Sequence, residues 1–234
     1  MNLAAKANLA ITDNLLTTTH SVKWRLDFAR PVDVEVVKRC IEIATHAPSR
    51  GNREQWHFII ITDPAKRAAM GDLYREGQAS FRVKRPRDIV YINQRSNAAY
   101  TFPEGSQRDI QRRAMSASSD YLVEHWQDAP VNIICCSERE TIHDLTMDTS
   151  FYRASLYGSI LPSVWSIMLA LRVRGLGSCY TTAHLAVEGK VAALLGIPDN
   201  IVQAAYLPVA HFKGKDFKVA KRRPLEEVTH WNAW

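Results

Sequence analysis

The stretch ASLYGSILPSVWSIMLAL, residues 154–171, is the longest run of this chain without a charged side chain. Its length approaches the roughly 20 apolar residues that a membrane-spanning helix needs. It nevertheless contains several serines, a glycine and a proline, and no second segment of this kind accompanies it. We therefore predict a buried helix of a soluble protein, from about residue 149 to 174, and no membrane anchor.

Small and bulky side chains alternate along this predicted helix, because residues three or four positions apart share one helix face. A stripe of small residues allows the close approach of either a flat ligand or a second helix, and both interpretations stay open. A proline inside a helix removes a backbone hydrogen bond and usually has a local reason. The small stripe is Ser155, Ser159, Pro162/Ser163, Ser166 and Ala170, and the bulky stripe is Leu156, Ile160, Val164, Ile167 and Leu171.

Length and composition indicate one ordinary globular domain. The 234 residues are 46% hydrophobic and 23% charged, and the net charge of +6 is too small and too dispersed to indicate nucleic acid. The N-terminus lacks the apolar core of a signal peptide, so no export is expected. The cysteines form no CxxC pair, which argues against a disulfide framework or a zinc site and favours the reducing cytoplasm. They are Cys40, Cys135, Cys136 and Cys179.

Hydrophobic periodicity predicts an α+β chain without internal repeats. The region at about 78–107 is basic, aromatic and proline-bearing, which suits a lid or binding loop or, alternatively, a surface excursion with some helix. Gly175 and Gly177 are expected to end the long helix, and the chain after about residue 209 to wrap the surface. Further helices are predicted at 33–44, 65–76, 109–127 and 186–195, and strands at 57–62, 131–136, 178–182 and 201–209.

A turn and two basic clusters are candidate ligand-binding features. In the turn APSRGN, residues 47–52, Ser49 and Asn52 present a hydroxyl and an amide to a heterocycle, or else satisfy their own backbone. The basic clusters are either solvated faces or the two parts of one phosphate site. The first cluster contains His20, Lys23 and Arg25, and the second contains Lys213, Lys215, Lys218, Lys221, Arg222 and Arg223.

Several familiar catalytic patterns are absent from the sequence. Gly175-Leu-Gly177 continues with Ser-Cys-Tyr, so no GxGxxG is present, and neither are Walker A, HExxH or GxSxG patterns. His143 and His184 lack suitably spaced partners, so no metal site is expected. Cys179 has no indicated base beside it and is interpreted as a buried structural thiol.

Several ordered segments make the chain resemble the FMN-dependent nitroreductase family over most of its length. THSVK at 19–23 corresponds to the family's RRSVR, and APSRGNREQWHF at 47–58 corresponds to APSxxNxQPWxF. PSVWSIMLALRVRGLGS at 162–178 corresponds to PAxQNxxLAAxxLGLGS. LGIP at 195–198 and RRPLEEVTHW at 222–231 match the family's closing segments, whereas the region at about 78–120 matches poorly.

This resemblance implies a nitroreductase-like α+β fold in one domain, residues 1–234, with a variable lid-like insertion at about 78–107. A central, mostly antiparallel sheet is flanked by helices, and an intertwined homodimer holds FMN at two sites in the subunit interface. The implied phosphate ligands are Ser21, Lys23, Arg222 and Arg223, assisted by His20 and Arg25. The implied neighbours of the isoalloxazine are Pro48, Ser49 and Asn52 on one side and Pro162, Ser163 and Gly177 on the other.

The implied activity is that of an FMN-dependent NAD(P)H oxidoreductase. Hydride passes from NADH or NADPH through FMN to a nitroaromatic, a quinone or a similar small acceptor, and no catalytic side chain is expected because the chemistry belongs to the flavin. Two alternatives are a flavin-dependent dehalogenase or dehydrogenase of the same family, and a non-catalytic flavin-binding or sequestering protein. The last is motivated by Glu54, Trp165 and the altered phosphate motif at His20 and Lys23.

Overall fold

A computed structural model describes residues 3–84, 91–93, 98–100, 104–139 and 149–234. In this part of the chain a five-stranded sheet has the order β1-β7-β5-β2, with β6 also paired to β7. All of its pairings are antiparallel, which confirms the predicted sheet. The strands are β1 (Leu26–Asp27), β2 (Trp56–Ile61), β5 (Val131–Glu138), β6 (Leu176–Ser178) and β7 (Ile201–Phe212).

The central strands are buried on both faces, which explains their continuous apolar sequence. In β5, Ile133 and Cys135 point to one hydrophobic cluster, whereas Ile134 and Cys136 point to the other. Ile134 lies opposite Tyr206 of β7 in the antiparallel register. The sheet therefore separates two layers of helices.

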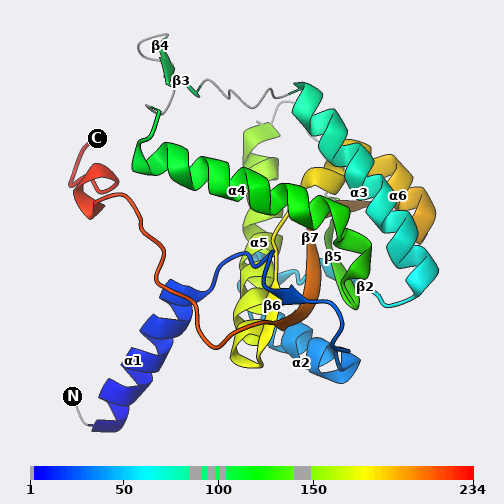
Figure 1. Ribbon diagram of the computed structural model, residues 1–234, viewed down its shortest axis with the longest axis horizontal. Coiled ribbons are helices and arrows are strands. Elements are labelled where there is room, and N and C mark those ends of the chain that lie inside the picture. The colour runs from blue at the N-terminus through cyan, green and yellow to red at the C-terminus, as the bar shows by residue number, and fades with distance from the viewer. Residues whose placement is uncertain (1–2, 85–90, 94–97, 101–103, 140–148) are drawn as a thin grey trace.

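Helices cover both faces of the sheet, as Figure 1 shows. α2 and α5 pack in the cluster on one face, and α3, α4 and α6 contribute to the cluster on the other. The side chain of Asp33 accepts a hydrogen bond from the amide of Glu35 and caps α2, as expected of an N-cap. The helices are α1 (Leu3–Thr18), α2 (Val34–Ala44), α3 (Pro64–Lys84), α4 (Gln107–Glu124), α5 (Thr149–Val173) and α6 (Glu188–Leu195).

α5 is the predicted long helix, and its bulky stripe faces the core. Ile160, Ile167 and Leu171 are fully buried, and Val164 nearly so. Among the described residues, α5 is the helix whose length and mean hydropathy of 1.5 would suffice to cross a membrane. Here its apolar face packs against α2 and the sheet instead.

Several elements differ from the sequence-based expectations. α1 was not predicted, because its apolar residues form no single stripe. α3 continues to Lys84, past Gly77, where the predicted helix stopped; the main chain at Ala183 approaches Gly77 so closely that a Cβ would collide with it. The strand predicted at 178–182 is reduced to β6 and an isolated bridge between Thr181 and Tyr206.

The predicted lid-like insertion is described only in part. β3 (Tyr91–Asn93) and β4 (Ala98–Tyr100) pair as a two-stranded antiparallel sheet. The rest of the insertion between Lys84 and Glu104, namely 85–90, 94–97 and 101–103, lies outside the described residues.

Two segments project from the same side of the molecule: α1 and the residues after β7, which we call the C-terminal arm (213–234) (Figure 1). The arm contains the short 3₁₀ helix η4 (Leu225–Glu227). Large apolar side chains on both segments face solvent. They include Ile11 (68% exposed), Leu225 (72%), Trp231 (84%) and Trp234 (90%).

Candidate functional site

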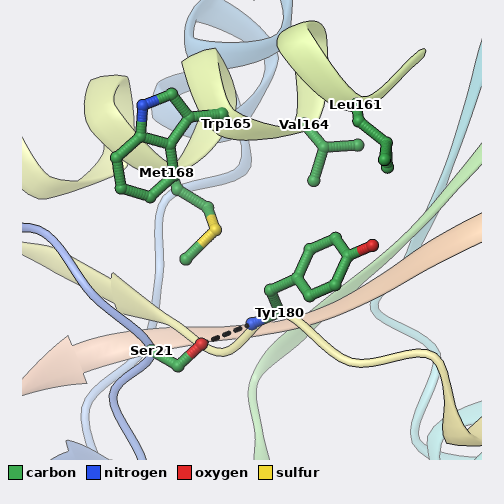
Figure 2. A pocket seen from close by; sticks show the side chains of 6 residues that line it. All are labelled: Ser21, Leu161, Val164, Trp165, Met168 and Tyr180. Atoms are coloured by element: carbon green, nitrogen blue, oxygen red, sulfur yellow. Dashed lines mark hydrogen bonds between the residues drawn. The ribbon is translucent and has the colours of Figure 1, made fainter. Parts of the chain in front are cut away.

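A pocket of about 240 Å³ lies beside α5, and we call it the α5 slot. Leu161, Val164, Trp165 and Met168 form one wall, because positions three and four apart stack on one face of a helix. Ser21 and Tyr180 form the facing wall (Figure 2). Aromatic and aliphatic surface with a few polar groups is typical of small-molecule sites.

Backbone pairing between distant segments fixes the wall opposite α5. The amide of Val22 donates to the carbonyl of Ser178 at 2.9 Å, which docks the N-terminal segment beside β6. The amide of Tyr180 donates to the hydroxyl of Ser21 at 3.1 Å (Figure 2). Ser21 therefore has a defined position at the polar end of the slot.

Lys23 follows Ser21 by two positions and provides positive charge nearby. Its ammonium group donates to the hydroxyl of Ser119 at 2.8 Å and more weakly to that of Ser118 at 3.4 Å. Both partners are neutral side chains of α4. Within the described part of the chain, Lys23 forms no ion pair with a carboxylate, so its charge is not compensated locally.

Of the other predicted phosphate ligands, His20 and Arg25 contact the first residues of the C-terminal arm. The ring of His20 packs edge-on against Phe217, with 4.9 Å between ring centres. The guanidinium of Arg25 donates to the main-chain carbonyls of Lys213 and Asp216. Arg222 and Arg223 are exposed on the arm and do not line the slot.

The turn at 47–52 largely satisfies its own polar groups. The hydroxyl of Ser49 accepts from the amide of Glu54 at 3.1 Å, and the side-chain amide of Asn52 donates to the Glu54 carboxylate at 3.4 Å. The turn also contacts α5, because the amide of Arg50 donates to the hydroxyl of Ser159 at 3.0 Å. Arg50 thus connects this turn to α5 at Ser159.

Ser159 and the slot lie on opposite sides of α5. A helix turns by about 100° per residue, so Ser159 and Ser163 point roughly half a turn away from Leu161 and Trp165. Ser163 is fully buried, and Pro162 is half-buried beside it. Within a single chain, the predicted ring neighbours near residues 48–52 are therefore separated from the slot by the helix.

Gly177 occupies the interior of β6 and does not line the slot. A Cβ at this position would lie 3.1 Å from the side chain of Leu26 and 3.3 Å from that of Val22. Its small size therefore accommodates the N-terminal segment in the single chain.

Sequence reasoning did not select Tyr180, Leu161 or Met168 as site residues. The spacing 161-164-165-168 on one helix face was available as a signal, whereas Tyr180 follows a strand and belongs to no periodic pattern. Its neighbour Cys179 is 2% exposed, and burial raises the pKa of that thiol above its ordinary value, against the smaller opposing effect of Lys23. This confirms that Cys179 is a buried structural thiol.

Comparison with known proteins identifies the family. The nitroreductase family model matches residues 16–211, and the chain belongs to this family. It is 23% identical to 5,6-dimethylbenzimidazole synthase of Rhodospirillum rubrum, with 79% of this chain and 77% of that protein covered. It is 26% identical to nitrobenzene nitroreductase of Ectopseudomonas oleovorans, with 80% of this chain and 81% of that protein covered.

A solved structure shares the fold at lower sequence similarity. Iodotyrosine deiodinase, crystallised with FMN and 3-iodo-L-tyrosine, superimposes with a TM-score of 0.65 and 17% identity. The match covers 95% of this chain and 99% of the deiodinase chain. Relatives of this chain therefore carry out different reactions on a common fold.

Proposed function

We propose that this protein is an FMN-dependent NAD(P)H oxidoreductase that reduces a nitroaromatic, a quinone or a similar small acceptor. The observation that carries the proposal is the α5 slot, which joins an apolar aromatic interior to Ser21, with Lys23 two positions along the same segment. A flat three-ring system with an anionic tail matches both halves of this arrangement.

The slot residues suit the ring of FMN. The indole of Trp165 and the phenol of Tyr180 border the slot from opposite walls (Figure 2), and aromatic faces favour stacked or edge-on contact with a planar ring. Val164 and Met168 are buried and keep the interior apolar. Ser21 offers a hydroxyl where the ribityl chain or phosphate would enter.

The phosphate is assigned to cations from both ends of the chain. Lys23 supplies one charge near Ser21, and Arg222 and Arg223 on the C-terminal arm supply the others. Arginine is the side chain best suited to paired hydrogen bonds with phosphate, because its guanidinium presents a planar fork of donors. The arm must therefore fold toward a slot, either its own or that of a second copy.

The complete site requires a homodimer in this proposal. The turn at 47–52 and the slot lie on opposite sides of α5, so both can border one ring only if the turn comes from a partner copy. The exposed apolar side chains of α1 and the arm provide the surface for such a dimer, since large exposed apolar patches usually mark interfaces. In solution we expect twice the chain mass of 26.5 kDa.

Bound FMN would supply the redox chemistry, accepting hydride from NADH or NADPH and delivering reducing equivalents to the acceptor. The protein would bind and orient the flavin and shield it from water, and no side chain of the slot is assigned as a general base. The four cysteines are free and buried, which fits the reducing cytoplasm that we propose as its location.

A second candidate is a flavin-dependent dehalogenase or dehydrogenase, which the similarity to iodotyrosine deiodinase and to the synthase favours. A third is non-catalytic flavin storage, because Trp165, which borders the slot, departs from the family pattern. Anaerobic absorbance spectra with NADPH and with NADH test the first candidate. Rapid bleaching of bound flavin supports the first candidate, and resistance to both nucleotides contradicts it.

The acceptor test separates the remaining two. A flavin that resists nucleotides but is reduced by dithionite and reoxidised by a halogenated phenol identifies the second candidate. Bound flavin that turns over with none of the nitroaromatic, quinone or halogenated acceptors identifies the third.

A further inference from the structure

The first residues of the C-terminal arm are hydrogen-bonded to Arg25. The Nε of Arg25 donates to the carbonyl of Lys213 at 2.7 Å, and its Nη1 donates to the carbonyl of Asp216 at 2.9 Å. The amide of Lys213 returns a hydrogen bond to the carbonyl of Arg25 at 2.7 Å. Hydrogen bonds from a charged donor are stronger than those between neutral groups. The bonds from the Arg25 guanidinium therefore hold the first residues of the arm in place.

Aromatic contacts of Phe217 also hold the first residues of the arm against the domain. The guanidinium carbon of Arg25 lies 3.9 Å from the ring centre of Phe217, a close cation–π geometry. The guanidinium carbon of Arg172 lies 4.6 Å from that ring centre, and the ring of His20 packs edge-on. Phe217 is 8% exposed, whereas most of the arm faces solvent. Phe217 is therefore the residue whose burial attaches the arm to the rest of the domain.

The turn before Phe217 contains a glycine, Gly214, that leaves room for the side chain of Arg25. Gly214 has a φ of +82°, a conformation that side-chain-bearing residues rarely adopt. A Cβ at Gly214 would also come within 2.9 Å of Nη2 of Arg25. Glycine thus allows both the turn and the close approach of the guanidinium.

Arg25 also lies between the two groups of proposed phosphate ligands along the chain. Lys23 precedes it by two positions, and β1, which follows it, pairs with Phe212 at the end of β7. Arg222 comes five residues after Phe217, which an extended chain spans in at most about 17 Å. The direction in which the chain leaves Phe217 therefore limits where Arg222 and Arg223 can bind.

We propose that Arg25 is a positioning residue of the phosphate site: by holding Lys213, Asp216 and Phe217, it sets the path of the arm that carries Arg222 and Arg223 to the phosphate. This inference rests on the proposed function. It assigns Arg25 an indirect role, since two of its guanidinium nitrogens already donate to main-chain carbonyls.

The first experiment needs no flavin. Hydrogen exchange of the amides at 213–217 is measured in the flavin-free wild type, in Arg25→Ala and in Arg30→Ala, which removes an exposed charge of the same segment. We expect faster exchange in Arg25→Ala and wild-type exchange in Arg30→Ala. Unchanged exchange in Arg25→Ala would overturn the anchoring role.

The second experiment compares FMN with riboflavin, which lacks the phosphate. Arg25→Ala should weaken FMN binding about tenfold, the effect of losing about 1.4 kcal/mol, and leave riboflavin binding unchanged. Phe217→Leu should do the same although it removes no charge, and Arg25→Lys should lie between wild type and Arg25→Ala. Adding Arg25→Ala to Arg222→Ala should cause little further loss, because both changes disable one contact.

The outcomes separate the inference from the proposed function. If Arg25→Ala weakens FMN binding but Phe217→Leu does not, Arg25 is a direct ligand and the positioning role is wrong. If both variants bind FMN as wild type does, the path of the arm does not affect the phosphate. If the wild type binds neither FMN nor riboflavin, the proposed function itself fails, and the phosphate role of Arg25 fails with it.

Discussion

The main-chain amide of Tyr180 donates a 3.1 Å hydrogen bond to the hydroxyl of Ser21, joining the segment after β6 to the segment after α1. This contact fixes the polar end of the α5 slot before any ligand arrives. The slot is therefore preorganised on one side by a hydrogen bond and on the other by a rigid helix, an arrangement that reduces the entropy lost on binding.

Replacing Ser21 with Ala should lower the free energy of unfolding by about 1 kcal/mol, the usual net value of an intramolecular hydrogen bond. It should also weaken FMN binding, because the hydroxyl faces the proposed phosphate entry. Denaturant unfolding of the flavin-free protein measures the first effect, and Ser21→Thr, which keeps a hydroxyl, is the control. Equal stability of Ser21→Ala and wild type would show that the Ser21–Tyr180 hydrogen bond contributes nothing.

Replacing Arg222 with Ala should weaken FMN binding by about 1.5–3 kcal/mol, the range for hydrogen bonds to charged groups. Riboflavin binding should not change, because the arginine is assigned to the phosphate alone. Fluorescence titration with both flavins gives the two dissociation constants. An unaltered FMN constant would mean that Arg222 points to solvent in the complex.

Replacing Trp165 should affect both flavins equally, since we assign its indole to the ring and not to the phosphate. Trp165→Ala is expected to weaken FMN and riboflavin alike by about 1 kcal/mol, within the range measured for aromatic pairs. Trp165→Phe keeps an aromatic face and should retain most of the affinity. Tighter binding by Trp165→Ala would instead identify Trp165 as an obstruction in the slot.

His184 should make stability depend on pH. Burial lowers the pKa of this imidazole to about 3 in the folded chain, against about 6.5 when unfolded. The stability it contributes is complete above pH 6.5 and is lost as pH falls toward 3, because the unfolded chain then binds the extra proton. Between pH 7 and pH 5 we expect a loss of about 2 kcal/mol.

The His184→Leu variant provides the comparison for this loss. Leucine cannot titrate, so the difference in unfolding free energy between pH 7 and pH 5 should shrink by that amount relative to wild type. Urea unfolding at both pH values measures it. The same pH dependence in both proteins would mean that other groups, not His184, cause the loss.

Much of the fold could be predicted because local signals agreed with tertiary packing. Asp33 caps a helix whose apolar face is buried, and the uncharged run at 154–171 forms the core helix α5. α1 could not be predicted this way, since its apolar residues form no single stripe and several of them, such as Ile11, face solvent. Gly77 suggested a helix end that the structure does not have. The glycine lies inside α3, where it leaves room for the main chain at Ala183.

The candidate site could be predicted in part. The segments around Ser21 and Trp165 do meet, but the hydrogen bond that places Tyr180 beside Ser21 depends on sheet pairing across the whole chain. Ser163 belongs to the same segment as Trp165, and yet it is buried in the core. The two side chains point in nearly opposite directions because they are two positions apart on a helix. Arg25 was grouped with the phosphate ligands by its charge alone, whereas its hydrogen bonds are to Lys213 and Asp216.

Equilibrium dialysis of the purified protein against FMN shows whether this chain holds the flavin. The bound flavin is counted from its visible absorbance, and the mass of the complex is measured by light scattering. We expect one FMN per chain in a dimer. A colourless protein that takes up no FMN at any accessible concentration would contradict it.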